Sequence, residues 1–342
     1  MNQKEHDVDI LVNHQSHLPK NAKLIKFENE KGREYQEYRN MWENNPKENI
    51  VESFPIHLDI ESTTACNMKC IMCPRTDMLL DGTFWKIENF NFEIYKKIID
   101  EGTKNKKLKS IKLQYLGEPL INKKLHKMIK YAKDKGVIDV MFNTNATLLN
   151  RKRAIEIINS GVDKIYFSFD SPYREKYNKI RVDGDYDQVL NNIRNFMALK
   201  KELNVSKPLT KVQMVLMKDN ESEWEDFKKL FEPIVDTVGY GVYLDHGTSN
   251  KIEQSKNKKK HKPFCCPSLW QRMYVHTDGI VTPCCLDSKR KLVMGNIREN
   301  SLTEIWNNKK YQEMRKLHRS GRFHEIDECR NCGLANYRKE EN

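Results

Sequence analysis

Short apolar runs alternate with longer amphipathic stretches from residue 54 onward. The apolar runs predict six strands, at residues 56–60, 110–116, 137–142, 164–169, 211–217 and 238–244. The stretches between them predict five helices, at residues 92–101, 123–135, 151–160, 186–203 and 223–231. Strands joined by helices form a parallel sheet with the helices outside it, because parallel neighbours need long crossover connections. The pattern therefore predicts an α/β fold with functional groups at the carboxyl ends of the strands.

This alternation is confined to residues 51–246, and the flanking parts of the chain differ from it. Residues 1–50 are a polar extension with one predicted helix at 28–42, which the Asn45-Pro46 pair would end. Residues 247–263 are a lysine-rich linker. Residues 264–342 are rich in cysteine and carry one predicted helix, at 303–318. A small region of this composition is held together by a metal centre rather than by its own core.

Composition narrows the functional classes. The 342 residues contain no run of 18 apolar residues and no secretory signal at the start, so we expect a cytoplasmic protein without a membrane span. Nine cysteines in a reducing compartment indicate metal or redox chemistry rather than a disulfide framework. The net charge of +12 is explained first by a lysine-rich surface that faces solvent. It also permits a phosphate-bearing partner.

The first cysteine group, Cys66-x3-Cys70-x2-Cys73, directly follows the first predicted strand. Three thiolates in so short a loop can bind one soft-metal centre, either zinc or an iron–sulfur cluster. A zinc site needs a fourth ligand, and none follows within about 190 residues. A cluster held by three cysteines leaves one iron open, which is typical of a catalytic site.

This motif at the end of the first strand resembles the signature of radical S-adenosylmethionine (radical SAM) enzymes. The resemblance implies a partial (β/α)6 barrel over residues 51–246, with Cys66, Cys70 and Cys73 binding a 4Fe-4S cluster that chelates S-adenosylmethionine. It also implies reductive cleavage of this cofactor to a radical that abstracts hydrogen from a substrate. The electron would come from an external donor such as flavodoxin or ferredoxin.

Residues at the next strand ends are similar to the cofactor-binding positions of this family. Gly117 permits close approach of the backbone, and the Glu118 carboxylate can accept a hydrogen bond from the cofactor ammonium. Small polar residues follow the third and fourth strands and suit ribose and carboxylate groups. The full set of expected cofactor-binding residues is Met72, Gly117, Glu118, Asn143, Asn145, Ser168, Asp170 and Arg181.

The second cysteine group is similar to the SPASM domain, a module that binds auxiliary iron–sulfur clusters. Its pattern is Cys266-x12-Gly279-x4-Cys284 followed by Cys329-x2-Cys332. The chain ends without the further cysteines of the fuller SPASM pattern, so we expect one auxiliary 4Fe-4S cluster in residues 264–342. A zinc ribbon would use the same spacing. Cys265 or Cys285 could replace its neighbour as ligand, and whichever is left over is a candidate hydrogen-atom donor.

The resemblance favours an enzyme that acts on a small molecule. The expected substrate is a sugar-like small molecule, a carbohydrate or aminocyclitol, in free or nucleotide-linked form. The expected outcome is dehydrogenation or epimerisation. The alternative is a peptide- or protein-modifying maturase. A nucleic-acid substrate is disfavoured because the sequence shows no appended RNA-binding module. A non-catalytic binding protein held by zinc is the remaining alternative.

Overall fold

The computed structural model describes residues 21–244, 252, 265–330 and 332–336. The predicted linker at 247–263 lies outside these residues, apart from Ile252. None of the helices in the described ranges has the length and apolar character needed to cross a membrane.

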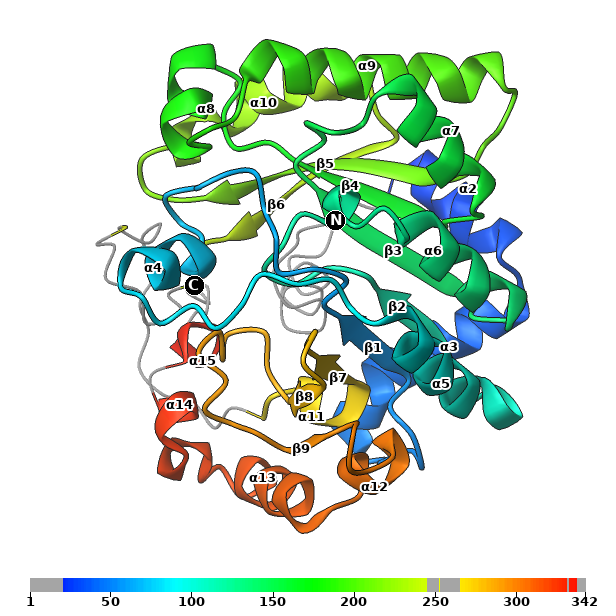
Figure 1. The fold of residues 1–342 in the computed structure, drawn as a ribbon, viewed down its shortest axis with the longest axis vertical. Helices are drawn as coiled ribbons and strands as arrows, with labels where there is room; N and C mark the ends of the chain where they lie inside the picture. The colour runs from blue at the N-terminus through cyan, green and yellow to red at the C-terminus, as the bar shows by residue number, and fades with distance from the viewer. Residues whose placement is uncertain (1–20, 245–251, 253–264, 331, 337–342) are drawn as a thin grey trace.

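A single nine-stranded sheet organises the chain, in the order β6-β5-β4-β3-β2-β1-β7-β8-β9 (Figure 1). The strands are β1 (His57–Ile60), β2 (Ser110–Lys112), β3 (Asp139–Thr144), β4 (Lys164–Ser168), β5 (Leu209–Leu216), β6 (Thr237–Val242), β7 (Arg272–Val275), β8 (Ile280–Thr282) and β9 (Gly295–Asn296). Strands β1 to β6 are all parallel, and β7 adds to β1 in parallel on the other side. Strands β8 and β9 follow as antiparallel additions. The parallel α/β core predicted from the sequence is confirmed.

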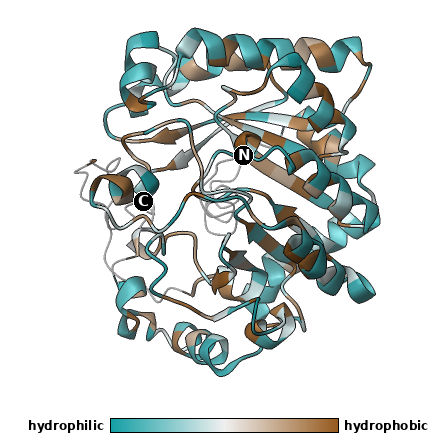
Figure 2. Cartoon of the chain, viewed as in Figure 1, coloured by the Kyte–Doolittle hydropathy of each residue, from teal (hydrophilic) through white to brown (hydrophobic). Residues whose placement is uncertain are grey.

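Helices cover the outer side of the first six strands. They are α5 (Phe92–Thr103), α6 (Leu125–Asp134), α7 (Arg151–Asn159), α8 (Arg174–Ile180), α9 (Tyr186–Glu202) and α10 (Trp224–Phe231), with 3-10 turns at Lys104–Lys106, Pro119–Ile121 and Glu221–Glu223. The short helix α4 (Pro74–Leu80) lies apart from the sheet, on the left of Figure 1. In Figure 2 these helices are largely hydrophilic on their outer surface. The C-terminal part adds α11 (Ser268–Gln271), α12 (Leu302–Trp306), α13 (Lys309–Arg319), a 3-10 turn (Phe323–Glu325), α14 (Asp327–Arg330) and α15 (Gly333–Asn336).

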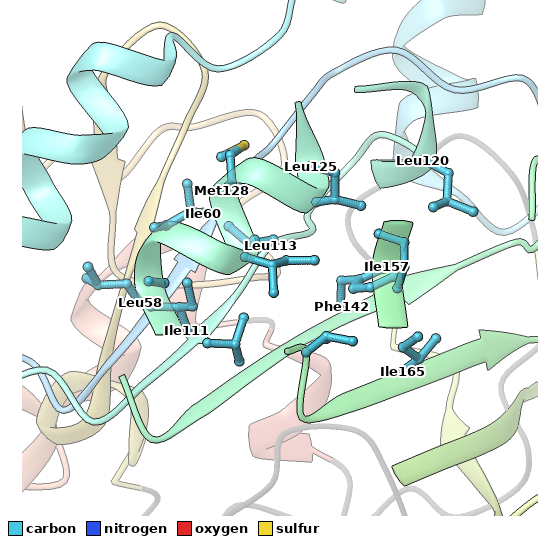
Figure 3. Packing of buried hydrophobic residues seen from close by; sticks show 14 of the residues in the cluster. Leu58, Ile60, Ile111, Leu113, Leu120, Leu125, Met128, Phe142, Ile157 and Ile165 are labelled. Atoms are coloured by element: carbon cyan, nitrogen blue, oxygen red, sulfur yellow. The ribbon is translucent and has the colours of Figure 1, made fainter. Parts of the chain in front are cut away.

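Side-chain alternation along the strands separates a core from a lumen. Leu58, Ile111, Phe142 and Ile165 are fully buried and face the helices, where α6 and α7 supply apolar partners (Figure 3). Successive residues of a strand point to opposite faces, so the residues next to these point into the partial barrel. Most lumen residues are polar or charged.

Two N-terminal helices, α2 (Ala22–Glu30) and α3 (Arg33–Glu48), cover the amino ends of the strands. Tyr38 accepts a hydrogen bond from Ser110 at the start of β2, at 2.8 Å. Tyr35 accepts one from Lys164 at the start of β4, at 2.9 Å. The Trp42 ring packs edge-on against His57 at the start of β1. These contacts pack α3 against the amino ends of the strands.

The helix predicted at 28–42 is wrong in extent. Gly32, at φ 74°, separates α2 from α3, and α3 continues through Pro46 to Glu48. Proline lacks the N–H that would bond the carbonyl four residues earlier. That carbonyl, on Trp42, instead accepts a hydrogen bond from the Gln271 amide at 2.6 Å. A partner distant in sequence therefore offsets the break that proline alone predicts.

Two further boundaries also differ. The helix predicted at 303–318 is two helices, because the Asn308 side chain accepts from the Tyr311 N–H and starts α13 anew. The strand predicted at 110–116 ends at Lys112, since the chain then turns toward the site described below.

Asp163 connects the junction of α2 and α3 to the sheet through Lys31, and replacing it should destabilise the fold. Its carboxylate accepts from Lys31, from Lys133 at 2.7 Å and from the Val140 N–H at 2.8 Å. We expect Asp163→Asn to cost about 3–5 kcal/mol in the free energy of unfolding, because it removes the carboxylate that pairs with the buried Lys31 and the partly buried Lys133. Urea denaturation measures this. The control, Asp134→Asn at an exposed helical ion pair, should leave the transition midpoint unchanged.

Candidate active site

The three N-terminal cysteines lie together in the loop between β1 and α4. A Cys73 N–H to Cys70 C=O bond of 3.1 Å closes a turn, and the backbone of the loop bonds to Ile180 and Val182. Burial, with a contribution from the neighbouring thiol groups, raises the pKa of Cys66 to about 11 and that of Cys70 to about 12. A cationic centre shared by these sulfurs would reverse that shift and favour the thiolates. The donor set therefore fits an iron–sulfur cluster.

Glu118 lies in a loop that packs directly on the residues after β1. Its N–H bonds to Ala65 O at 2.8 Å. A Cβ on Gly117 would lie 2.1 Å from Thr63 O, so only glycine fits here. The loop thereby places the Glu118 carboxylate close enough to Cys66 to influence the pKa of that thiol.

The Glu118 carboxylate is buried and held by neighbouring donors. It accepts from Thr144 Oγ1 at 2.6 Å, from the Asn145 N–H at 2.7 Å and from the Leu120 N–H at 3.0 Å. Burial raises its pKa, and these hydrogen bonds oppose the shift. An ammonium group placed beside it would favour the ionised form further. This arrangement suits recognition of the amino group of a ligand.

Asp170 and Arg181 form a buried ion pair beside Cys70. Arg181 Nε donates to Asp170 Oδ2 at 2.5 Å, and Arg181 Nη1 lies 3.7 Å from Cys70 Sγ. The other Asp170 oxygen accepts from the Val215 N–H at 2.7 Å. The guanidinium of this neutral pair therefore lies next to the cysteine loop, and the pair connects that loop to β5.

The asparagines at the end of β3 have different environments. Asn145 is engaged with the cysteine loop, because its Nδ2 donates to Asn67 Oδ1 at 3.0 Å and its Oδ1 accepts from Thr147. Asn143 Oδ1 is buried without a hydrogen-bond partner in the described structure. Ser168 is half-buried at the end of the neighbouring strand β4. The importance of Asn67 was missed from the sequence, although it lies inside the Cys66-x3-Cys70 spacing.

A cavity of about 620 Å³ occupies the lumen and reaches the cysteine loop. Met72, Cys73 and Asn143 line it on the side of that loop. Tyr115, Tyr274 and Cys285 line it elsewhere. Its volume lies within the range of small-molecule sites, roughly 300–1,000 Å³. One cavity therefore connects the first cysteine group with a residue of the second.

The C-terminal cysteines divide into a close group and an outlier. The thiol of Cys266 interacts electrostatically with those of Cys332, Cys329 and Cys285. A hydrogen bond joins Cys284 to Cys285. Cys265 interacts instead with Arg319 on α13. The described residues hold no three His, Cys, Asp or Glu side chains arranged for a single metal ion. The geometry brings Cys266, Cys284, Cys285, Cys329 and Cys332 together and leaves Cys265 apart.

Two family models match this chain. The Radical SAM superfamily model matches residues 60–231, and an iron–sulfur cluster-binding domain model, SPASM, matches residues 265–333. The chain belongs to the radical SAM superfamily. It is therefore an enzyme, and the cofactors expected from the sequence, S-adenosylmethionine with a 4Fe-4S cluster and an auxiliary cluster in the SPASM domain, are confirmed.

Curated relatives of this radical SAM enzyme span most of the chain. A tungsten-containing aldehyde ferredoxin oxidoreductase cofactor-modifying protein of Pyrococcus furiosus is 23% identical over 81% of this chain and 87% of its own. An S-adenosyl-L-methionine-dependent 2-deoxy-scyllo-inosamine dehydrogenase of Niallia circulans is 23% identical over 83% and 95%. These relatives cover both the barrel and the C-terminal region.

Solved structures show the same fold. BtrN in complex with AdoMet and 2-DOIA superposes with a TM-score of 0.55 at 18% identity, over 83% of this chain and 94% of that one. SuiB of Streptococcus suis bound to S-adenosylmethionine superposes with a TM-score of 0.64 at 14% identity, over 83% and 72%. At these identities the likeness establishes the radical SAM/SPASM fold alone.

Proposed function

We propose that this radical SAM/SPASM enzyme abstracts hydrogen from a carbohydrate or aminocyclitol-like small molecule, with dehydrogenation or epimerisation as the outcome. The observation that carries the proposal is the lumen cavity, which has the volume of a small-molecule site and touches both cysteine groups. Its lining of amide, hydroxyl and charged side chains suits a ligand rich in hydroxyl or amino groups. The dehydrogenase relative from Niallia circulans, by its name, acts on an aminocyclitol.

Cys66, Cys70 and Cys73 are the proposed ligands of the catalytic cluster. When bound there, S-adenosylmethionine supplies a 5′-deoxyadenosyl radical that takes a hydrogen atom from the substrate. Around this position, Glu118 would accept from the cofactor ammonium and Gly117 would leave room for it. The remaining proposed cofactor contacts are Met72, Asn143, Asn145, Ser168, Asp170 and Arg181. Among these, the unpartnered Asn143 oxygen is available as an acceptor from a ligand.

Cys285 is the proposed hydrogen-atom donor if the reaction is an epimerisation. It lines the cavity, whereas Cys265 faces Arg319 and does not. The Cys285 thiol also lies near Arg272 and Tyr274. Its S–H bond would deliver a hydrogen atom to a substrate radical. The resulting thiyl would return to the thiol by taking up a proton and an electron from an external donor such as flavodoxin or ferredoxin.

The proposed ligands of the auxiliary cluster are Cys266, Cys284, Cys329 and Cys332. Single substitutions should separate ligands from non-ligands among the adjacent cysteines. After anaerobic reconstitution we expect roughly eight irons per chain, two clusters of four. Cys266→Ala and Cys284→Ala should each lose about half of this iron, because each removes a ligand. Cys265→Ala is the matched control and should keep it. Iron analysis measures the difference, and equal iron in the Cys265 and Cys266 variants would contradict the assignment.

Turnover in deuterated water tests the proposed reaction. Candidate sugars, aminocyclitols and peptides are incubated with reconstituted enzyme, S-adenosylmethionine and dithionite, and products are analysed by mass spectrometry. Epimerisation predicts a product with one deuterium at the inverted carbon, which Cys285→Ala abolishes. Dehydrogenation predicts the loss of two hydrogens without deuterium incorporation. A panel in which only peptides are converted would contradict the proposal and favour the maturase alternative, for which SuiB with its precursor peptide is the structural parallel.

A further inference from the structure

Cys284 and Cys285 are adjacent in the chain, and both thiols lie near other cysteines of the C-terminal group. The Cys284 thiol interacts electrostatically with those of Cys332 and Cys266. The Cys285 thiol interacts with the same two cysteines. A cluster in this group is therefore within reach of either sulfur, and contacts outside the group must decide which of the two it takes.

The surroundings of the two cysteines differ. Cys284 Sγ accepts a hydrogen bond from the Leu286 N–H at 3.3 Å. Hydrogen bonds to ligand sulfurs are among the interactions by which proteins tune iron–sulfur clusters. Cys285 instead lines the lumen cavity, and Cys284 is not among the described residues that do so. Cys284 therefore has the surroundings of a ligand, whereas Cys285 borders the cavity.

Two tyrosines of the cavity wall contact Cys285 from different sides. The Tyr115 hydroxyl donates a hydrogen bond to the Cys285 carbonyl oxygen at 3.2 Å. The Cys285 thiol lies beside Tyr274 and Arg272, and both of these also line the cavity. Tyr115 therefore restrains the backbone of Cys285, and the side-chain neighbours of its sulfur belong to the cavity wall.

Tyr115 is itself held by packing against the hairpin that leads to this cysteine. Its ring packs edge-on against His276, with the ring centres 5.0 Å apart, and lies 5.9 Å from the ring of Tyr274. His276 Nε2 lies 2.9 Å from Thr282 Oγ1 on β8. Tyr274 is paired with Thr282 in the β7–β8 ladder. These ring contacts do not involve the Tyr115 hydroxyl, so Tyr115→Phe should remove the bond to Cys285 and keep the packing.

We infer that Tyr115 is a positioning residue, which keeps the Cys285 thiol in the cavity and leaves Cys284 as the ligand of the auxiliary cluster. This rests on the proposed function and deepens it, because a sulfur bound to iron has no hydrogen atom to deliver. The bond from Tyr115 restrains the Cys285 peptide. It thereby opposes the backbone rotation that would exchange the directions of the two adjacent side chains.

Iron content after anaerobic reconstitution tests this inference. Cys285→Ala should keep roughly eight irons per chain, and Cys284→Ala should keep about half of them. Adding Tyr115→Phe to Cys284→Ala should restore most of the lost iron, because the released Cys285 can then serve as the fourth ligand. Tyr131→Phe, which removes an exposed hydroxyl bonded to Asp100, is the matched control in the same background and should restore none.

Alkylation of the reconstituted holoenzyme gives a second measurement that leaves every cysteine in place. Without S-adenosylmethionine, iodoacetamide should modify Cys285 roughly tenfold or more faster than Cys284, because a sulfur bound to iron is not free to act as a nucleophile. Tyr115→Phe should reduce this preference. Tandem mass spectrometry locates the label on one or the other cysteine.

Three results would overturn the inference. They are faster labelling of Cys284 than of Cys285, loss of iron in Cys285→Ala, and the same iron content and labelling with Tyr115→Phe as with Tyr131→Phe. Neither measurement requires turnover. An enzyme that gives the expected iron and labelling but converts no sugar or aminocyclitol would therefore contradict the proposed function alone.

Discussion

The pairing of β1 with two strands at once is the constraint on which the site depends. Strand β1 bonds in parallel to β2 within the barrel and to β7 at the start of the C-terminal region. Hydrogen bonding on both edges fixes the register of all three strands and aligns their carboxyl ends. The loop after β1 carries Cys66, Cys70 and Cys73, and the hairpin that begins with β7 leads to Cys284 and Cys285. Two cysteine groups nearly 200 residues apart in sequence consequently border one lumen.

The alternation of side chains along the strands forms the hydrophobic core on one face of the sheet and the polar lumen on the other. Residues facing the helices are aliphatic or aromatic and supply the burial that stabilises the barrel. Their neighbours face the lumen and are mostly polar, and α3 covers them at the amino ends through Tyr35, Tyr38 and Trp42. The lumen cavity thus contacts the loop of Cys66, Cys70 and Cys73 at one end and the buried ion pairs of Asp59 and Asp139 at the other.

Much of this could be predicted from the sequence, because it depends on local signals. Strand and helix alternation, the cysteine spacing and the Gly117-Glu118 pair are all readable within short windows. The path of α3 is different, since Pro46 is tolerated only because Gln271 satisfies the Trp42 carbonyl. The separation of Cys265 from Cys266 likewise depends on Arg319, which lies on another helix. Lys211 also has the composition of a surface charge in the sequence, and only the pairing of β5 with β4 shows that it is buried inside the barrel.

We propose that Cys66, Cys70 and Cys73 serve the radical chemistry and that a separate cysteine group binds the auxiliary cluster. The most direct measurement compares wild type with the Cys66→Ala, Cys70→Ala, Cys73→Ala triple variant after anaerobic reconstitution, by iron content and by 5′-deoxyadenosine formed with dithionite and S-adenosylmethionine. We predict that the variant keeps about half of the iron and forms no 5′-deoxyadenosine. Formation of 5′-deoxyadenosine by the triple variant at the wild-type rate would show that these cysteines do not hold the catalytic cluster.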